Sequence, residues 1–388
     1  MKVKVLSQFI IASLTAASTL SLTSCFKDEP LNAECDIEQV YVHLSDPSSV
    51  FFNAGDTLLT VSSDVQRIVF RKKDNADVSR LALWFRLTEG ATITPTNGSV
   101  QDFSDDREVT YRVTSQDGQW HRDYQVCFRT SDPVSRFDFE HFRLVNGNNG
   151  GQYYVWSDLY PDGTEVANWA TGNPGFNISC GSALPEEYPT STLDAGYEGH
   201  GVKLTTRSTG PLGAMVGRRI AAGNLFLGYF DVSKALTNTL KATHFGLPFS
   251  RKPLRFTGWY KYTPGDNYQD ANGKTVAAKV DKASVYAVFY RNKDKDGHDV
   301  MLYGDDVMTN DHIVAVARVA EVSPATEWTH FDIPFVYSQE IDADALNSLG
   351  YNLAVVFSSS EDGDLFCGAI GSTLCIDEVN VEWEEVEP

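Results

Sequence analysis

One strand-like segment carries the side chains that are best suited to hold a ligand. The alternation over residues 254–262 predicts a β-strand whose successive side chains point to opposite faces. The face expected in the core carries Leu254, Phe256, Gly258, Tyr260 and Tyr262. The other face carries Arg255, Thr257, Trp259 and Lys261. A tryptophan flanked by two cations on a solvated face is typical of a site that stacks on the CH face of a sugar ring. The alternative is that a neighbouring loop or domain covers Trp259.

A second group of candidates lies in a long region without clear periodicity. Trp156, Trp169 and Asn173 occur there among glycine, asparagine and proline residues. They could form the wall of a pocket that is built from loops. The other interpretation is that the two tryptophans anchor an otherwise structureless segment, because a long loop needs such anchors.

Catalytic signatures are scarce. The motifs Gly-x-Ser-x-Gly and His-Glu-x-x-His and the phosphate-binding loops are absent. Residues 292–297 resemble the start of a calcium-binding EF-hand loop, but the twelfth position is Tyr303, so a hairpin turn is the better interpretation. A glycosidase needs two carboxylates across the scissile bond, and a chain with 52 acidic residues always offers some pair. Enzymatic activity therefore stays open.

The N-terminal residues have the pattern of an export signal. Lys2 and Lys4 precede a mostly apolar stretch, residues 5–22, which ends in Leu22-Thr23-Ser24-Cys25. This ending resembles the lipobox of bacterial lipoproteins. The resemblance implies a signal peptide over residues 1–24, lipid on Cys25 and a lipidated tether over residues 25–35. The alternative is an ordinary signal peptide with a chance cysteine.

The residues after Cys25 resemble an address for the cell surface. Phe26 beside the cysteine is similar to lipoproteins sent to the outer membrane, and the cluster Lys27-Asp28-Glu29 resembles the export signal of Bacteroidetes surface lipoproteins. The resemblance implies a lipid-anchored protein of the outer membrane that faces outwards. The alternative is that the cluster is a solvated tether.

Composition excludes several classes of protein. The 388 residues are 42% hydrophobic and 12% aromatic, which is too apolar for a disordered chain. The net charge of -20, with no concentrated basic face, excludes nucleic acid as a partner. No apolar run after the N-terminus reaches the ~20 residues of a membrane-spanning helix. We therefore expect contact with the membrane through the lipid anchor only.

The patterns predict an all-β protein of two domains. Short alternating runs separated by turn signals over residues 36–131 indicate an immunoglobulin-like sandwich, with Trp120 in its core. Residues 136–388 also consist mainly of strand patterns, and helical signals are confined to residues 232–240 and 342–349.

Three segments of the larger domain carry a family resemblance. They are Trp169-Ala170-Thr171-Gly172-Asn173-Pro174-Gly175, Ala221-Ala222-Gly223-Asn224-Leu225-Phe226-Leu227-Gly228 and Gly258-Trp259-Tyr260-Lys261-Tyr262-Thr263-Pro264-Gly265. They resemble the "putative carbohydrate metabolism domain" of Bacteroidetes lipoproteins, and the order of parts also resembles jelly-roll carbohydrate-binding modules. The resemblance implies a jelly-roll β-sandwich over residues 136–388.

The same resemblance implies a surface lipoprotein that binds a glycan and assists polysaccharide capture or utilisation. Its partners would be a poly- or oligosaccharide and other glycan-uptake proteins of the outer membrane. Two alternatives stay open: a glycoside hydrolase or polysaccharide lyase on the same sandwich, and a structural or adhesin-type module without a sugar site.

The jelly-roll resemblance also suggests one metal. In those modules, acids near the positions of Glu140 and Asp377 often hold a structural Ca²⁺ together with backbone carbonyls. The alternative is that Asp377, on an apolar strand face, is satisfied by hydrogen bonds. No other cofactor is expected.

Five further cysteines match no zinc spacing. Cys35 could pair with Cys127, and Cys367 with Cys375, while Cys180 is left over. Buried thiols are the favoured state for most of them.

Overall fold

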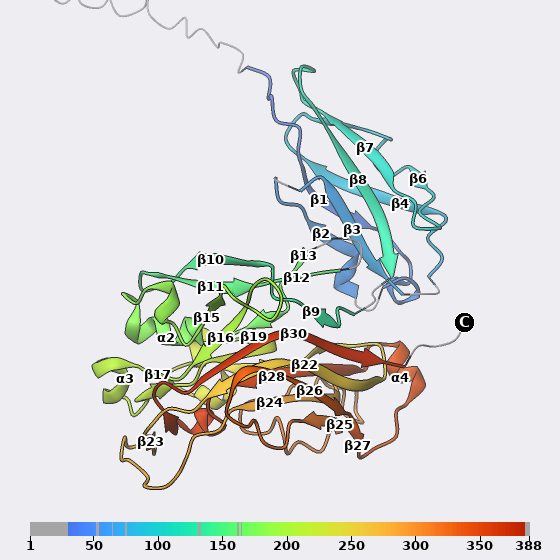
Figure 1. The fold of residues 1–388 in the computed structure, drawn as a ribbon. Helices are drawn as coiled ribbons and strands as arrows, with labels where there is room; N and C mark the ends of the chain where they lie inside the picture. The colour runs from blue at the N-terminus through green and yellow to red at the C-terminus, as the bar shows by residue number, and fades with distance from the viewer. Residues whose placement is uncertain are drawn as a thin grey trace, which may run out of the picture. The chain divides into compact units, whose positions relative to one another are not determined.

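The computed structural model describes residues 30–384 except 52–53, 64, 74–75, 131–132, 161–162 and 164 (Figure 1). The predicted signal peptide and the lipidation site Cys25 lie outside the described residues. The chain divides into two compact units, residues 1–130 and 131–388. Among the described residues, no helix is both long enough and apolar enough to cross a lipid bilayer.

The first unit is an immunoglobulin-like sandwich of two four-stranded sheets. One sheet has the order β2 (Leu58–Thr60), β1 (Ile37–Val42), β4 (Leu81–Leu87) and β6 (Val100–Gln101). The other has the order β3 (Arg67–Lys72), β8 (His121–Thr130), β7 (Val109–Thr114) and β5 (Thr92–Thr94), with β3 and β8 parallel. Two short 3₁₀ helices, η1 (Pro47–Ser49) and η2 (Ala54–Thr57), lie between β1 and β2.

Alternating side chains of both sheets form the core of this unit. Phe70 and Phe128 stack at 4.8 Å between ring centroids, and Phe85 contacts Tyr111 across the sandwich at 4.6 Å. Trp120 was expected in this core, and that expectation is wrong, because it lies in the turn before β8 and is 61% exposed.

The second unit is a larger sandwich of two sheets. The longer path runs β14 (Trp169–Ala170), β19 (Asn224–Phe230), β28 (Tyr351–Ser358), β24 (Ser284–Arg291), β25 (Ile313–Arg318) and β27 (Val336–Tyr337), with β20 (Thr243–Phe245) and β21 (Leu247–Pro248) attached. We call this eight-stranded sheet the large sheet. The facing sheet runs β15 (Thr190–Leu193), β16 (Gly201–Thr205), β30 (Thr373–Trp383), β22 (Pro253–Thr263) and β26 (Ala325–Pro334), with β9 (Arg136–Phe137) attached to β30. We call it the small sheet.

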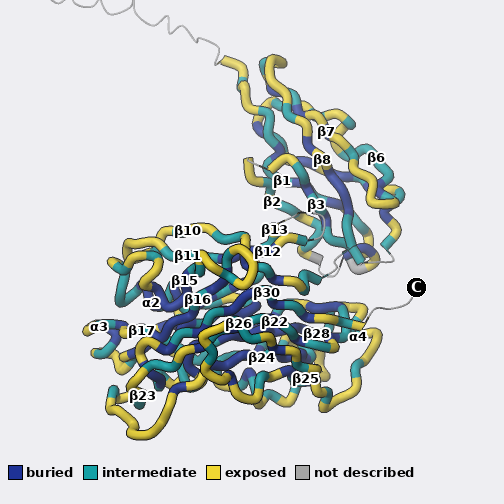
Figure 2. The backbone as a smooth tube through the Cα atoms, in the orientation of Figure 1, coloured by how far each residue is buried: buried dark blue, intermediate teal, exposed yellow. Residues whose placement is uncertain are grey.

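The main core takes its side chains from both sheets. Figure 2 shows that their central strands are largely buried. The large sheet also buries its outer face. Phe226, Tyr290 and Val356 belong to a second apolar cluster there. Its central strands β24 and β28 are therefore nearly continuous apolar runs, as is typical of strands that are covered on both faces.

Helices are few and short, and their placement differs in part from expectation. The helices α2 (Asn173–Cys180) and α3 (Gly210–Met215) were not predicted. The segment expected to be helical at 232–240 forms only two 3₁₀ turns, η4 (Val232–Lys234) and η5 (Thr239–Lys241). Within residues 342–349, α4 covers Ala343–Asn347, and Asp342 caps it by accepting a hydrogen bond from the N–H of Ala345.

Short strand pairs and single turns complete the second unit. The pairs are β10 (Phe142–Asn146) with β11 (Gln152–Trp156), β12 (Asp158–Leu159) with β13 (Glu165–Val166), β17 (Arg207–Ser208) with β18 (Ile220–Ala221), and β23 (Tyr268–Gln269) with β29 (Gly368–Ala369). The remaining 3₁₀ turns are η3 (Pro185–Glu187) and η6 (Gly363–Leu365).

Candidate functional site

The predicted alternation of β22 is confirmed on the small sheet. Phe256, Tyr260 and Tyr262 are buried, and Trp259 and Lys261 on the other face are partly exposed. Leu254 is the exception to the prediction. It is 40% exposed, because the register against β30 shifts between Pro253 and Arg255 and interrupts the alternation there.

A loop places a second aromatic ring on Trp259. The ring of Tyr197 lies parallel to that of Trp259, with centroids 3.9 Å apart and an interplanar angle of 10°. Tyr197 is 41% exposed, so this ring, rather than Trp259 alone, faces solvent. The ring of Trp328, on the neighbouring strand β26, stands at 85° to Tyr197 with centroids 6.4 Å apart.

Two basic side chains border these rings. His330 is the cross-strand partner of Trp259, and their ring centroids are 4.9 Å apart. The Lys261 ammonium lies 4.9 Å from the ring centroid of Trp328. We call Tyr197, Trp259, Trp328, His330 and Lys261 the aromatic platform.

Arg255 does not join this group. Its guanidinium lies 2.6 Å from Oδ1 of Asp332 on β26, so an acid already neutralises it. Sequence reasoning found Trp259 and Lys261 but missed Tyr197, Trp328 and His330. The spacing of Trp328 and His330 on one strand face could have revealed two of these; Tyr197 lies in a loop that has no periodicity.

Hydrogen bonds to two carboxylates hold the loop that carries Tyr197 in place. Oδ2 of Asp377 accepts hydrogen bonds from the backbone N–H groups of Tyr197 (2.6 Å) and Glu198 (3.0 Å). Oε1 of Glu140 accepts one from the N–H of His200 (2.7 Å), and Oε2 contacts Nδ1 of the same histidine at 2.9 Å. Gly199 has a φ of +52°, and a Cβ there would lie 2.0 Å from Oε1 of Glu140, so this position requires glycine.

These contacts do not fit the calcium site suggested by the resemblance. The remaining oxygen, Oδ1 of Asp377, accepts a hydrogen bond from the N–H of Glu378 (2.8 Å). All four carboxylate oxygens of Glu140 and Asp377 therefore face nitrogen donors, whereas a calcium cage needs six to eight oxygens free to coordinate. Glu140 and Asp377 instead hold the loop in place through hydrogen bonds.

The environments of the two acids shift their pKa values in opposite directions. Burial raises the pKa of Asp377 to about 6, although its backbone hydrogen bonds oppose this. Burial also acts on Glu140, but the bonds from His200 outweigh it and lower the pKa of Glu140.

One other cluster among the described residues has metal-ligand geometry. One potential ligand atom from each of Asp294, Asp296 and His298 lies close enough to the other two to bind the same metal ion. Asp296 and His298 are exposed. Oδ1 of Asp294 already accepts hydrogen bonds from the N–H groups of Asp296 and His298. Lys293 and Asp299 pair as in an antiparallel bridge, so the expected hairpin turn at 292–297 is confirmed.

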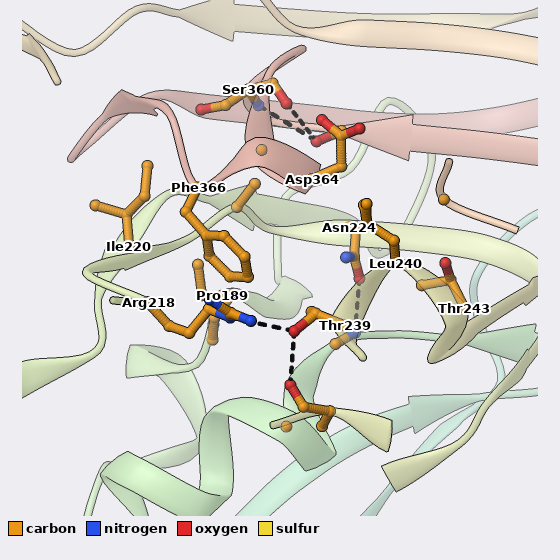
Figure 3. Close-up of a pocket in the computed structure, with 18 of the residues that line it drawn as sticks. Pro189, Arg218, Ile220, Asn224, Thr239, Leu240, Thr243, Ser360, Asp364 and Phe366 are labelled. Carbon is orange, nitrogen blue, oxygen red and sulfur yellow. Dashed lines mark hydrogen bonds between the residues drawn. The ribbon is translucent and has the colours of Figure 1, made fainter. Parts of the chain in front are cut away.

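A pocket of about 470 Å³ lies on the outer face of the large sheet (Figure 3). Its floor includes Phe226, Tyr286 and Val356, whose neighbours along the strands point into the main core. Helices α2 and α3, residues 235–236 after η4, the turn η5 and the segment around η6 supply the walls. This volume lies in the range of sites for small ligands.

Both arginines of this pocket contact a neighbouring side chain. Arg318 lies 3.9 Å from the Glu361 carboxylate, and the Arg218 guanidinium lies 4.5 Å from the ring centroid of Phe366. Burial raises the pKa of Asp364. A buried carboxyl group with a raised pKa is a feature that catalytic sites and structural carboxylates share.

Family comparisons agree with both units. The family described as "Putative carbohydrate metabolism domain" matches residues 138–382. The chain belongs to this family. The family described as "SGBP, N-terminal" matches residues 49–127. The chain matches none of the curated proteins with which it was compared.

Two solved structures from Bacteroides resemble this member of the carbohydrate metabolism domain family. Both are described as putative glycoside hydrolases. The one from Bacteroides thetaiotaomicron is 36% identical, covers 93% of this chain and all of its own, and has a TM-score of 0.63. The one from Bacteroides vulgatus is 36% identical, covers 65% of this chain and 99% of its own, and has a TM-score of 0.61.

The other predicted ligand-binding residues of this family domain lie inside it. Trp156 is 2% exposed, and Trp169 is 7% exposed and packs edge-on against Phe137 at 5.0 Å. Asn173 is fully buried, where its amide exchanges two hydrogen bonds with the backbone of Thr190. Their assignment to a pocket wall is therefore corrected, because buried rings and a satisfied amide cannot contact a ligand.

A buried carboxylate explains how Trp169 is held. Its Nε1 donates to Oδ1 of Asp158 at 3.0 Å. Asp158 is 4% exposed, and burial raises its pKa to about 7, although the bonds from Trp169 and Asn168 oppose this.

Four of the cysteines are thiols. Cys35, Cys180, Cys367 and Cys375 form no disulfide, so neither suggested pair is present. Burial raises the pKa of Cys375, which makes this thiol a poor nucleophile.

Proposed function

We propose that this protein captures a poly- or oligosaccharide at the bacterial surface, held to the outer membrane by lipid on Cys25. The aromatic platform of the small sheet is the glycan contact. The observation that carries the proposal is the exposed Tyr197 ring stacked on Trp259, with Trp328 standing at a right angle to it.

Physical chemistry favours a sugar over other ligands at this platform. A pyranose has an apolar CH face that packs flat against an aromatic ring, and a ring of hydroxyls at its edge. Tyr197 offers the flat surface, Trp328 offers a wall, and Lys261 and His330 offer polar groups at the border. Because Tyr197 and Trp259 are already stacked on each other, their side chains lose little conformational freedom when a ligand binds.

The assignment to the cell surface rests on the first unit and the N-terminus. The match to the SGBP N-terminal family supports a surface protein that handles glycans, and the lipobox-like sequence before Cys25 supports the anchor. An anchored sandwich would act as a spacer that holds the glycan-binding domain away from the membrane, beside other glycan-uptake proteins.

A second candidate function is glycoside hydrolysis or polysaccharide lysis in the pocket of the large sheet. The raised pKa of Asp364 favours it, as do the descriptions of the two Bacteroides relatives. Hydrolysis needs a second carboxylate, and the nearby Glu361 is engaged by Arg318. Binding at the platform is therefore the better supported function.

A glycan array with product analysis on the same glycans tests the proposal. We expect the purified chain to retain particular glycans and to release no shortened products. Cleavage would establish the hydrolase or lyase instead. Failure to bind any plant, host or microbial glycan would leave the structural or adhesin-type module.

A further inference from the structure

Arg218 is a cation in the pocket of the large sheet without an acidic partner among the described residues. Most arginines of this chain lie against a carboxylate, as Arg255 does with Asp332. Arg218 instead donates from Nε to Oγ1 of Thr239 (3.2 Å) and makes one long contact, 3.5 Å, from Nη1 to the carbonyl oxygen of Val216. The guanidinium has five N–H donors, so most of its hydrogen-bonding capacity stays available.

The surroundings fix the direction of this arginine. Its guanidinium carbon lies 4.5 Å from the centroid of the Phe366 ring, so one planar face is covered. Figure 3 shows Arg218 beside Phe366 and reaching towards Thr239, among the residues that line the pocket. Thr239 is in turn held by the carbonyl oxygen of Ala235, to which its hydroxyl donates at 2.9 Å. The planar guanidinium group of Arg218 is therefore held in position before a ligand binds.

A planar, preorganised guanidinium suits a planar anion. Arginine binds carboxylates through two parallel N–H···O bonds, and such charge-assisted bonds are stronger than neutral ones. The rest of the lining is largely apolar, and Phe366 lies beside the cation. The best-fitting ligand therefore has one carboxylate, an apolar face and a size well below 470 Å³.

A uronic acid residue meets all three conditions. Its pyranose ring has an apolar CH face, and its C6 carboxylate lies at the edge of the ring. We propose that this pocket is a second glycan site, which takes a uronic acid unit with its carboxylate on Arg218 and its ring against the apolar lining. This inference goes beyond binding at the aromatic platform and uses none of its residues.

Binding of charged and esterified sugars tests the second site. Calorimetry would compare trisaccharides of galacturonate, glucuronate and mannuronate with their methyl esters, which keep the shape and lose the charge. We expect at least one acid to bind the native full chain tenfold or more tightly than its ester. Arg218→Gln should abolish this preference, and Arg218→Lys should restore only part of it, because an ammonium lacks the planar fork.

The neighbouring arginine supplies the control. Arg219 is exposed and does not line the pocket, so Arg219→Gln should keep the preference. Tyr197→Ala should keep it as well, since the platform is a separate site; loss of platform binding alone would therefore leave this inference intact. Equal affinity for every acid and its ester, or an undiminished preference in Arg218→Gln variants that melt like the native chain, would overturn it.

Discussion

Tyr197 lies flat on Trp259, with ring centroids 3.9 Å apart and planes within 10° of parallel. One face of the tryptophan is thereby covered, as one of the two interpretations of the sequence anticipated. The ring that solvent reaches is Tyr197, and its position depends on Asp377, which accepts the backbone N–H of that tyrosine. In the glycan contact that we propose, a loop residue, Tyr197, therefore rests on a strand residue, Trp259.

Loss of the hydrogen bonds that Asp377 accepts should weaken glycan binding although every aromatic ring of the platform is kept. In Asp377→Ala the N–H groups of Tyr197 and Glu198 lose their acceptor, so the loop should leave the Trp259 ring for part of the time. We expect affinity for the bound glycan to fall about tenfold, which corresponds to ~1.4 kcal/mol. Asp377→Asn keeps one acceptor oxygen for the N–H groups of Tyr197 and Glu198 but turns an amide NH2 towards the N–H of Glu378, so we expect a smaller loss than in Asp377→Ala. Native affinity in both variants would show that Asp377 does not position the platform.

The buried carboxylate of Asp158 should make stability depend on pH. Its pKa is about 7 in the folded chain and near 3.8 when unfolded, so the folded state binds the proton more readily. Stability from this group is therefore greatest below pH ~4 and falls as the pH rises from about 4 to about 7. The difference corresponds to ~4 kcal/mol at most.

The variant Asp158→Asn isolates this effect. The amide oxygen can still accept the Trp169 Nε1 hydrogen bond, but it carries no charge. We expect a higher melting temperature than that of the native chain at pH 8 and a smaller difference at pH 5. Parallel melting curves for the two proteins across this range would contradict the account.

Removal of metal should leave the fold unchanged. Because nitrogen donors face all four oxygens of Glu140 and Asp377, addition of EDTA should not lower the melting temperature of the purified chain. A calcium site filled at a hundredfold excess over its Kd would contribute ~2.7 kcal/mol. A clear drop that added Ca²⁺ reverses would restore the site suggested by the resemblance.

Lipid attachment should depend on a single thiol. Cells fed an alkyne fatty acid should label the native chain, and Cys25→Ala should abolish the label because the acylated sulfur is missing. Cys180→Ala removes a thiol of the second unit and should be labelled normally. Label retained in the Cys25 variant would refute the lipoprotein assignment.

Strand patterns predicted most of the fold because their signals are local. The alternation along β22 identified the core face that carries Phe256 and Tyr260, and apolar runs identified β24 and β28. Short helices such as α2 escaped because eight residues with proline and glycine near the start give little periodicity.

The site was harder to predict because it depends on contacts between distant residues. Tyr197 and Asp377 are 180 positions apart, and no local pattern reports their hydrogen bond. The sequence left two interpretations of Trp156 and Trp169 open, because composition does not distinguish a ring that anchors a loop from a ring that faces solvent, and the structure shows that both are buried. Arg218 belongs to no motif, and only the pocket around it gives it a role.

The most direct test of the central claim is the glycan affinity of Tyr197→Ala, measured beside Tyr229→Ala. Both tyrosines belong to the second unit, both are about half exposed, and each stacks on one ring, that of Tyr229 being His244 at 4.0 Å. Only Tyr197 belongs to the aromatic platform. We predict that Tyr197→Ala weakens binding of the glycan identified on the array about thirtyfold, ~2 kcal/mol, with little change in melting temperature, and that Tyr229→Ala binds normally. Native affinity in Tyr197→Ala, or equal losses in the two variants, would contradict glycan capture at the platform.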